Sequence, residues 1–193
     1  MSAIRSHELI RKAIHLSSSA IPLLYWFFLE RHQVLEGVIV LAFGFLMAEY
    51  LRLHSDASRR LFMRIFGSAL RSHEHQNLTG ATYVFVGSVL TIFLFPKEIA
   101  VASLLILSIS DTFAALIGIP FGRHKFLAKS AEGSTTFFIA TLIILQIIFP
   151  ATLFFNIVVA VTLTVAEAYP MDLDDNFVIP ILSGILLSLI SLV

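Results

Sequence analysis

The sequence predicts an all-α polytopic membrane protein with about seven transmembrane helices, an N-terminal amphipathic helix and one cytoplasmic interfacial helix. Of its 193 residues, 58% are hydrophobic and 13% are charged, and the mean hydropathy is +0.90. Soluble domains are about 45–50% apolar and about 25% charged, so this composition is typical of an integral membrane protein. We expect residues 1–193 to form a single integral-membrane domain. The absence of cysteine excludes disulfides, thiolate metal sites and thiol nucleophiles.

Seven apolar segments approach the length needed to cross a hydrocarbon core of about 30 Å. The fifth and sixth form a helical hairpin that is broken at Pro150. The predicted spans are residues 16–29, 34–53, 81–95, 99–118, 134–149, 151–166 and 177–192.

Lysine and arginine are distributed unequally between the two sides that these spans define. One side holds three in the N-terminal segment, five in the second connection and three in the fourth, whereas the other side holds only Arg31 and Lys97. The positive-inside rule makes the first side cytoplasmic. We therefore expect a multi-pass protein of the cell (plasma) membrane with its N-terminus inside and its C-terminus outside.

The N-terminal segment has a polar stripe at helical spacing, formed by Glu8, Arg11, Lys12 and His15. One interpretation is an interfacial anchor whose bases touch lipid headgroups. The alternative is that Arg11 and Lys12 hold phosphate groups.

The second connection begins with an amphipathic segment, residues 57–71, that is expected to lie on the membrane as a surface helix with solvated arginines. Its apolar face is formed by Leu61, Phe62, Ile65, Phe66, Ala69 and Leu70.

The polar stretch HEHQNLTGATY (residues 73–83) follows this segment and leads into the third span. A transition-metal site at its start is not favoured, because adjacent residues in a helix do not share a face. Thr79 and Gly80 instead predict a helix start whose free N–H groups receive an anion.

The fourth span contains an aspartate, Asp111, on a narrow polar face with Ser108, Thr112 and Ala115. A carboxylate at this depth is costly and is usually kept for an ion, a proton or a substrate. The span leads through glycines into a basic loop and then a glutamate: Gly118, Gly122, Arg123, Lys125, Lys129 and Glu132. An acid, glycines and bases beside a membrane suggest a site for a metal-bound phosphate group.

The last cytoplasmic connection is acidic and carries Glu167, Asp172, Asp174 and Asp175. It is either a solvated loop or a source of ligands for Mg²⁺, which typically binds one or two carboxylates together with substrate phosphates. The sequence has no Walker A motif and no G-x-G-x-x-G, which argues against a P-loop or Rossmann nucleotide site.

Five motifs spread over nearly the whole chain resemble, in order, those of the polyprenol kinase family, which includes dolichol kinase, phytol kinase and CTP-dependent diacylglycerol kinase. They are ELIRKAIH (8–15), EHQNLTGATY (74–83), LSISDTFAALIGIPFG (107–122), KSAEGS (129–134) and LDDNFVIPILSG (173–184). The resemblance implies a catalytic domain that transfers the γ-phosphate of CTP to the hydroxyl of a membrane lipid.

The residue patterns and the resemblance together give the expected site. Nucleotide-binding residues are expected to be Arg11, Lys12, His15, Asn77, Thr79, Gly80, Gly118, Lys129, Ser130, Gly133, Ser134 and Asn176. The expected Mg²⁺ ligands are Asp111, Glu132, Asp174 and Asp175. The expected catalytic residues are Asp111, Lys129, Asp174 and Asp175. Asp174 or Asp175 is expected to accept the proton of the lipid hydroxyl.

The expected acceptor is an isoprenoid alcohol of the phytol, geranylgeraniol or dolichol type, and diacylglycerol is the alternative. The run from Ser110 to Gly133 is also similar to one in phosphatidate cytidylyltransferases, but the C-terminal signature of those enzymes is missing here. A small ion-coupled transporter, with Asp111 as its ion site, is a third possibility. The one-sided polar motifs and the lack of an inverted repeat argue against it. The expected partners are CTP, the lipid alcohol and the bilayer, and nothing suggests nucleic-acid binding.

Overall fold

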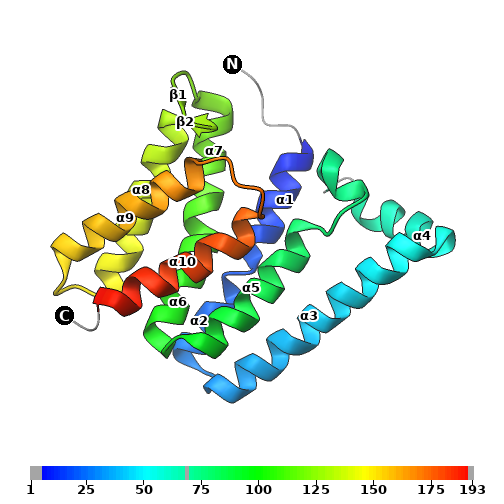
Figure 1. Ribbon diagram of the computed structural model, residues 1–193, viewed down its shortest axis with the longest axis horizontal. Coiled ribbons are helices and arrows are strands. Elements are labelled where there is room, and N and C mark those ends of the chain that lie inside the picture. The colour runs from blue at the N-terminus through cyan, green and yellow to red at the C-terminus, as the bar shows by residue number, and fades with distance from the viewer. Residues whose placement is uncertain (1–5, 68–69, 191–193) are drawn as a thin grey trace.

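The computed structural model describes residues 6–67 and 70–190, and this part of the chain is mostly helical (Figure 1). The α-helices are α1 (Ser6–Ser17), α2 (Ala20–Phe27), α3 (Arg31–His54), α4 (Asp56–Phe66), α5 (Gly80–Leu94), α6 (Lys97–Leu105), α7 (Asp111–Phe121), α8 (Ala131–Ile148), α9 (Leu153–Ala168) and α10 (Asp175–Ile190). A short 3₁₀ helix, η2 (Ser72–His75), precedes α5, and a π-helical turn, η3 (Ile106–Ser110), joins α6 to α7.

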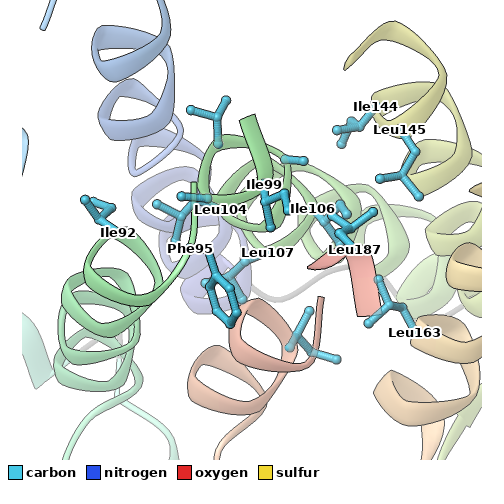
Figure 2. Packing of buried hydrophobic residues seen from close by; sticks show 14 of the residues in the cluster. Ile92, Phe95, Ile99, Leu104, Ile106, Leu107, Ile144, Leu145, Leu163 and Leu187 are labelled. Carbon is cyan, nitrogen blue, oxygen red and sulfur yellow. The ribbon is translucent and has the colours of Figure 1, made fainter. Parts of the chain in front are cut away.

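The continuous helix α6–η3–α7 forms the centre of the molecule. Its apolar stretch is 72% buried inside the protein, compared with 22% for α3 and 33% for α8. Side chains from α5, α8, α9 and α10 pack around it (Figure 2). The labelled members of this core are Ile92, Phe95, Ile99, Leu104, Ile106, Leu107, Ile144, Leu145, Leu163 and Leu187.

Three described helices are long and apolar enough to cross a membrane: α3, the central helix and α8. Helices α5, α9 and α10 are apolar but shorter, at 10–17 residues. These six coincide with the second to seventh predicted spans, while the count of seven crossings and their orientation stay predictions. In Figure 1 the start of α1, the hairpin after α7 and the α9–α10 connection lie toward the same upper end of the molecule.

The first predicted span is not a single long helix. Its helical part, α2, has only eight residues, and it is separated from α1 by a turn at Ser18 and Ser19. The hydroxyls of Ser17, Ser18 and Ser19 donate to the carbonyls three residues earlier. Such local bonds compete with the helical ladder, and Pro22 removes a further N–H, so the helix is interrupted here.

Two other expectations need correction. The fold is not purely helical, because a small antiparallel hairpin, β1 (Lys125–Phe126) and β2 (Lys129–Ser130), joins α7 to α8. The interfacial helix α4 ends at Phe66 rather than at Arg71, and Ala69 of its predicted face lies outside the described residues. None of the eleven described residues of α4 is buried, which agrees with a surface helix.

Two close helix contacts depend on glycine. A Cβ at Gly133 of α8 would lie 3.1 Å from the Ala114 carbonyl and 3.2 Å from the Cα of Gly118. A Cβ at Gly184 of α10 would lie 2.2 Å from the ring of Phe95. Larger residues at these positions would therefore force helices apart.

We expect Gly184→Ala to lower the free energy of unfolding by about 1–3 kcal/mol, because the new methyl overlaps the buried Phe95 ring. Gly44→Ala is the matched control, since a Cβ at Gly44 meets nothing within 4 Å and removing a helical glycine stabilises by about 1 kcal/mol or less. Thermal unfolding in detergent micelles measures both. Equal melting temperatures for the two variants would contradict the packing described here.

Candidate functional site

The side chain of Asp111 is held by two residues of α1. Lys12 Nζ lies 2.5 Å from Asp111 Oδ2, and His15 Nε2 lies 3.3 Å from the same oxygen. His15 Nε2 also donates to the Leu107 carbonyl, in the π-turn immediately before Asp111, over 2.9 Å. Single π-turns are frequent at functional sites, because they change which carbonyls remain available and re-aim the side chains that follow.

Helix α1 turns its polar stripe toward the protein interior. Lys12 is only 4% exposed, whereas Leu9, Ile10 and Ile14 on the other face are each 45–49% exposed. This is the reverse of a soluble amphipathic helix and fits a helix whose outer face contacts lipid. The arrangement favours the second interpretation of the stripe, in which its bases belong to a site.

Arg11 is paired within the same stripe. Its Nε donates to Glu8 over 3.2 Å, and its Nη2 contacts the other carboxylate oxygen. Burial alone would raise the pKa of Glu8, but the Arg11 guanidinium outweighs it and holds that pKa below its ordinary value.

The β1–β2 hairpin carries Lys129 to the end of α9. Leu127 in the turn adopts a positive φ of 50°, and the Ala128 N–H donates to the Ala168 carbonyl over 3.0 Å. Lys129 Nζ then lies 2.9 Å from Glu167 Oε1 and 3.6 Å from Asp175 Oδ2. Burial would lower the pKa of Lys129, but these two carboxylates outweigh it and raise that pKa, so the ammonium stays charged.

Helices α7 and α8 cross where Gly118 meets Gly133. Ser130, the N-cap of α8, accepts a hydrogen bond from the Gly133 N–H over 3.2 Å, and its hydroxyl lies 3.4 Å from the Gly118 carbonyl. The next residue, Ser134, has a buried hydroxyl with no hydrogen-bond partner among the described residues. The predicted KSAEGS motif therefore forms a tight helix start beside Asp111's helix.

The α9–α10 connection closes the site. Asp174 accepts the Asn176 N–H over 2.9 Å at the start of α10, and its other oxygen lies 3.7 Å from Arg71 Nη1. Burial and the neighbouring charge of Asp175 raise the pKa of Asp174 above its ordinary value. Asn176 is buried, and its amide lies so close to Gly80 that a Cβ there would be 2.9 Å away.

Two adjoining cavities lie among these residues and share Arg71, Ala128, Lys129 and Glu167. The inner cavity, of about 360 Å³, is lined further by Arg11, Lys12, Asp111, Gly118, Ser130 and Gly133. The outer cavity, of about 480 Å³, is lined further by Asn77, Tyr83, Tyr169, Asp172, Asp174 and Asp175. Three predicted motifs thus meet at the inner cavity, from α1, from the central helix and from the hairpin.

The start of α5 does not offer free N–H groups as predicted. The Thr79 N–H donates to Glu49 over 2.9 Å, and the Gly80 N–H donates to Glu74 over 3.0 Å. Arg52, which is 1% exposed, pairs with Glu49 and donates to the carbonyls of His75 and Asn77. Protein carboxylates therefore occupy the position where an anion was expected, and the N–H groups of Thr79 and Gly80 hold the start of α5 to them.

Glu132 also lies away from the place expected of it. Its carboxylate contacts His124, whose side chain is 81% exposed, at 2.9 Å, and it lines neither cavity. Glu167, which the sequence analysis assigns only to an acidic connection, is the glutamate that pairs with Lys129. The sequence does contain a signal for Glu167: it is an ionisable residue in the last turn of an apolar span, and such residues usually belong to a functional site. Arg71 was missed because nothing in its spacing ties it to Asp111, and Glu8 was recognised only as a member of the polar stripe.

The residues around the inner cavity could supply some, but not all, of the ligands of a cation such as Mg²⁺. The described residues contain no group of three or more carboxylates or histidines arranged to hold a metal. Mg²⁺, however, commonly takes one or two carboxylates and completes its shell with water and phosphate oxygens. Glu167 Oε2 is buried and has no hydrogen-bond partner in residues 6–67 and 70–190. The cavity therefore contains one carboxylate oxygen that is available to bind a cation. Both side-chain contacts to Asp111 fall on Oδ2, and Asp111 and Glu167 are the carboxylates that would hold a metal ion at this cavity.

The chain is similar to named proteins over most of its length. CTP-dependent diacylglycerol kinase 1 of Schizosaccharomyces pombe is 30% identical over 215 residues, which cover 96% of this chain and 94% of that protein. The protein of the same name from Saccharomyces cerevisiae is 27% identical, with 96% of this chain and 74% of that protein covered. An uncharacterized protein of Rickettsia prowazekii is 31% identical and covers 89% of this chain. No protein-family model and no solved structure matches the chain.

We expect Arg52→Met to destabilise the fold by about 3–5 kcal/mol, because it leaves the buried Glu49 carboxylate without its counter-charge. Arg60→Met, on the exposed face of the adjacent α4, should change stability by about 0.5 kcal/mol or less. Chemical unfolding in mixed micelles measures both. A small effect of Arg52→Met would show that the pair does not hold the start of α5.

Proposed function

Because the chain belongs to the family of the CTP-dependent diacylglycerol kinases, we propose that it transfers the γ-phosphate of CTP to the hydroxyl of diacylglycerol in a membrane. The named relatives support a CTP-dependent lipid kinase. They do not support the isoprenoid alcohol that the sequence motifs first suggested, and diacylglycerol replaces it as the proposed acceptor.

The observation that carries this proposal is the meeting of Arg11, Lys12, Lys129 and Asp111 around one cavity. Phosphoryl transfer needs positioning and charge neutralisation more than covalent help from the protein. Three cations that face a partly enclosed space supply the neutralisation, and they act more strongly there than in water.

We place the phosphates in the inner cavity and the nucleoside in the outer one. The inner cavity has the cations, and at Gly118 and Gly133 it has backbone without side chains, which permits close approach of a phosphate. The outer cavity has Tyr83 and Tyr169, whose rings offer surfaces for a base, together with the polar Asn77. Nothing in either cavity argues for cytosine over adenine, so the choice of CTP rests on the relatives.

Within the inner cavity, Asp111 and Glu167 would hold Mg²⁺, which when bound neutralises charge on the nucleotide phosphates. Lys129 would shift from Glu167 and Asp175 toward a phosphate oxygen. Asp175 lies beside Lys129 and next to Asn176, and we assign it as the acceptor of the proton that leaves the lipid hydroxyl.

The transfer itself is tested with purified protein in mixed micelles containing Mg²⁺ and CTP labelled at either the α- or the γ-phosphate. The acceptors are diacylglycerol, geranylgeraniol, dolichol and phosphatidate. We expect label from the γ-position, and only from it, to enter diacylglycerol. Label from the α-position entering phosphatidate would assign a cytidylyltransferase, and γ-label entering only an isoprenoid alcohol would restore the first expectation.

The site is tested by substitution. Asp111→Asn should lower kcat about 10³-fold, because an amide neither balances Lys12 nor binds Mg²⁺ well. Glu167→Gln should cost more activity than Glu132→Gln, since only Glu167 lines the cavities. Arg60→Ala, on the exposed face of α4, should retain wild-type turnover. Equal losses for the two glutamate variants would remove Glu167 from the site.

A further inference from the structure

A third cavity, of about 340 Å³, lies where α1, α3, α4 and α5 meet, and we call it the apolar groove. Its walls are built largely from aliphatic and aromatic side chains. Phe45 of α3 and Phe85 of α5 stack with their ring centroids 4.7 Å apart, and Phe62 of α4 lies over the Arg52 guanidinium at 5.2 Å. Helix α4 is thus tied to the buried Glu49–Arg52 pair, which fixes one wall of the groove.

The groove has a polar end that adjoins the proposed phosphate site. Arg11 lines both the groove and the inner cavity, and His15, which also lines the groove, touches Asp111. Glu74 and Asn176 complete this end. A group placed there lies between the bases of α1 and the start of α10.

The charges at the polar end are already matched. Arg11 is paired with Glu8, and Glu74 accepts the backbone N–H groups of Arg71 at 2.8 Å and Gly80 at 3.0 Å. The rest of the groove's lining is mostly apolar, so the groove suits a hydrocarbon chain with a neutral hydroxyl better than a phosphate.

The groove also faces outward through exposed apolar side chains. Ile14 is 49% exposed, Leu41 44% and Phe66 45%, and all three line the groove. In a membrane protein such residues contact lipid tails, so the groove opens toward the hydrocarbon through them. A chain from the bilayer enters here without crossing water.

We infer that the apolar groove binds one hydrocarbon chain of the acceptor lipid and presents its neutral hydroxyl group beside Arg11. The inference rests on the proposed function for the identity of the lipid, diacylglycerol. It assigns a second substrate site, distinct in lining and charge from the two polar cavities. It also assigns Leu41, Phe45 and Phe85 as contacts of the chain.

The test uses a matched pair of substitutions on α3. Leu41 and Leu46 are 44% and 42% exposed, but only Leu41 lines the groove. Leu41→Trp should raise the KM for dioleoylglycerol about tenfold, because the larger ring fills space that the chain needs. The dissociation constant for CTP should not change. Leu46→Trp should leave both constants at their wild-type values.

A photoreactive benzoylphenylalanine in place of Leu41 or Leu46 gives a second, activity-independent measurement. We expect diacylglycerol adducts at position 41 well above those at position 46, found by mass spectrometry and suppressed by excess unlabelled dioctanoylglycerol. Equal adducts at the two positions would overturn the inference. Covalent dimers at position 41 in place of lipid adducts would also overturn it, and would assign the groove to a second copy of the chain.

The two proposals fail in different ways. If the wild-type protein transfers γ-phosphate but Leu41→Trp and Leu46→Trp behave alike, the kinase stands and the groove is not the acceptor site. If no phosphate is transferred but competed diacylglycerol adducts form at position 41, the groove stands as a lipid site and the proposed function fails. If Leu41→Trp loses CTP binding and hence its fold, the adduct measurement decides the question.

Discussion

The structure depends on supplying a counter-charge to one carboxylate, that of Asp111. Asp111 lies in the central helix, and an unpaired charge there would cost several kcal/mol, so the chain supplies Lys12 and His15 from α1. This requirement explains why α1 turns its bases inward and its leucine and isoleucines outward. It also explains the π-turn before Asp111, since the Leu107 carbonyl in that turn holds the His15 ring against the carboxylate. A helix that would otherwise lie on a membrane surface is thereby fixed as one wall of a site.

A second constraint brings the bases of the connecting hairpin to the same place. Helices α7 and α8 approach closely because Gly118 faces Gly133, and a short solvent-exposed hairpin joins them. Its Lys129 therefore reaches back to the end of α9, where Glu167 is buried and needs a counter-charge. The carboxylates of Asp111 and Glu167 are each paired with a base from a different segment. Such an arrangement is ready to exchange protein ion pairs for phosphate and metal contacts when a nucleotide binds.

Sequence reasoning predicted what periodicity and local spacing determine. Helical spacing placed Arg11, Lys12 and His15 on one face, and hydropathy located the six longer apolar helices. Sequence reasoning failed where contacts between distant segments determine which groups are paired. The N–H groups of Thr79 and Gly80 look free in the sequence, but Glu49 and Glu74 bind them from outside that helix. Glu132 was preferred to Glu167 because it stands in a motif, although only the docking of the hairpin on α9 determines which glutamate meets Lys129. The break in the first span depends on three serine hydroxyls that bond to their own helix, which a hydropathy count does not detect.

The position of Arg11 connects the two halves of the proposed reaction. A lipid kinase must join a nucleotide that arrives from water with an acceptor that remains in the bilayer, and its two sites therefore need different linings but a common boundary. Here the inner cavity and the apolar groove share Arg11, which lies on α1, the helix whose Lys12 pairs with Asp111. Glu8 keeps this guanidinium in place in the absence of substrates. A guanidinium has five donors in a fixed plane, so Arg11 can keep a bond to Glu8 while it contacts a phosphate oxygen on one side and a hydroxyl on the other. Lysine at this position would keep the charge but lose that geometry.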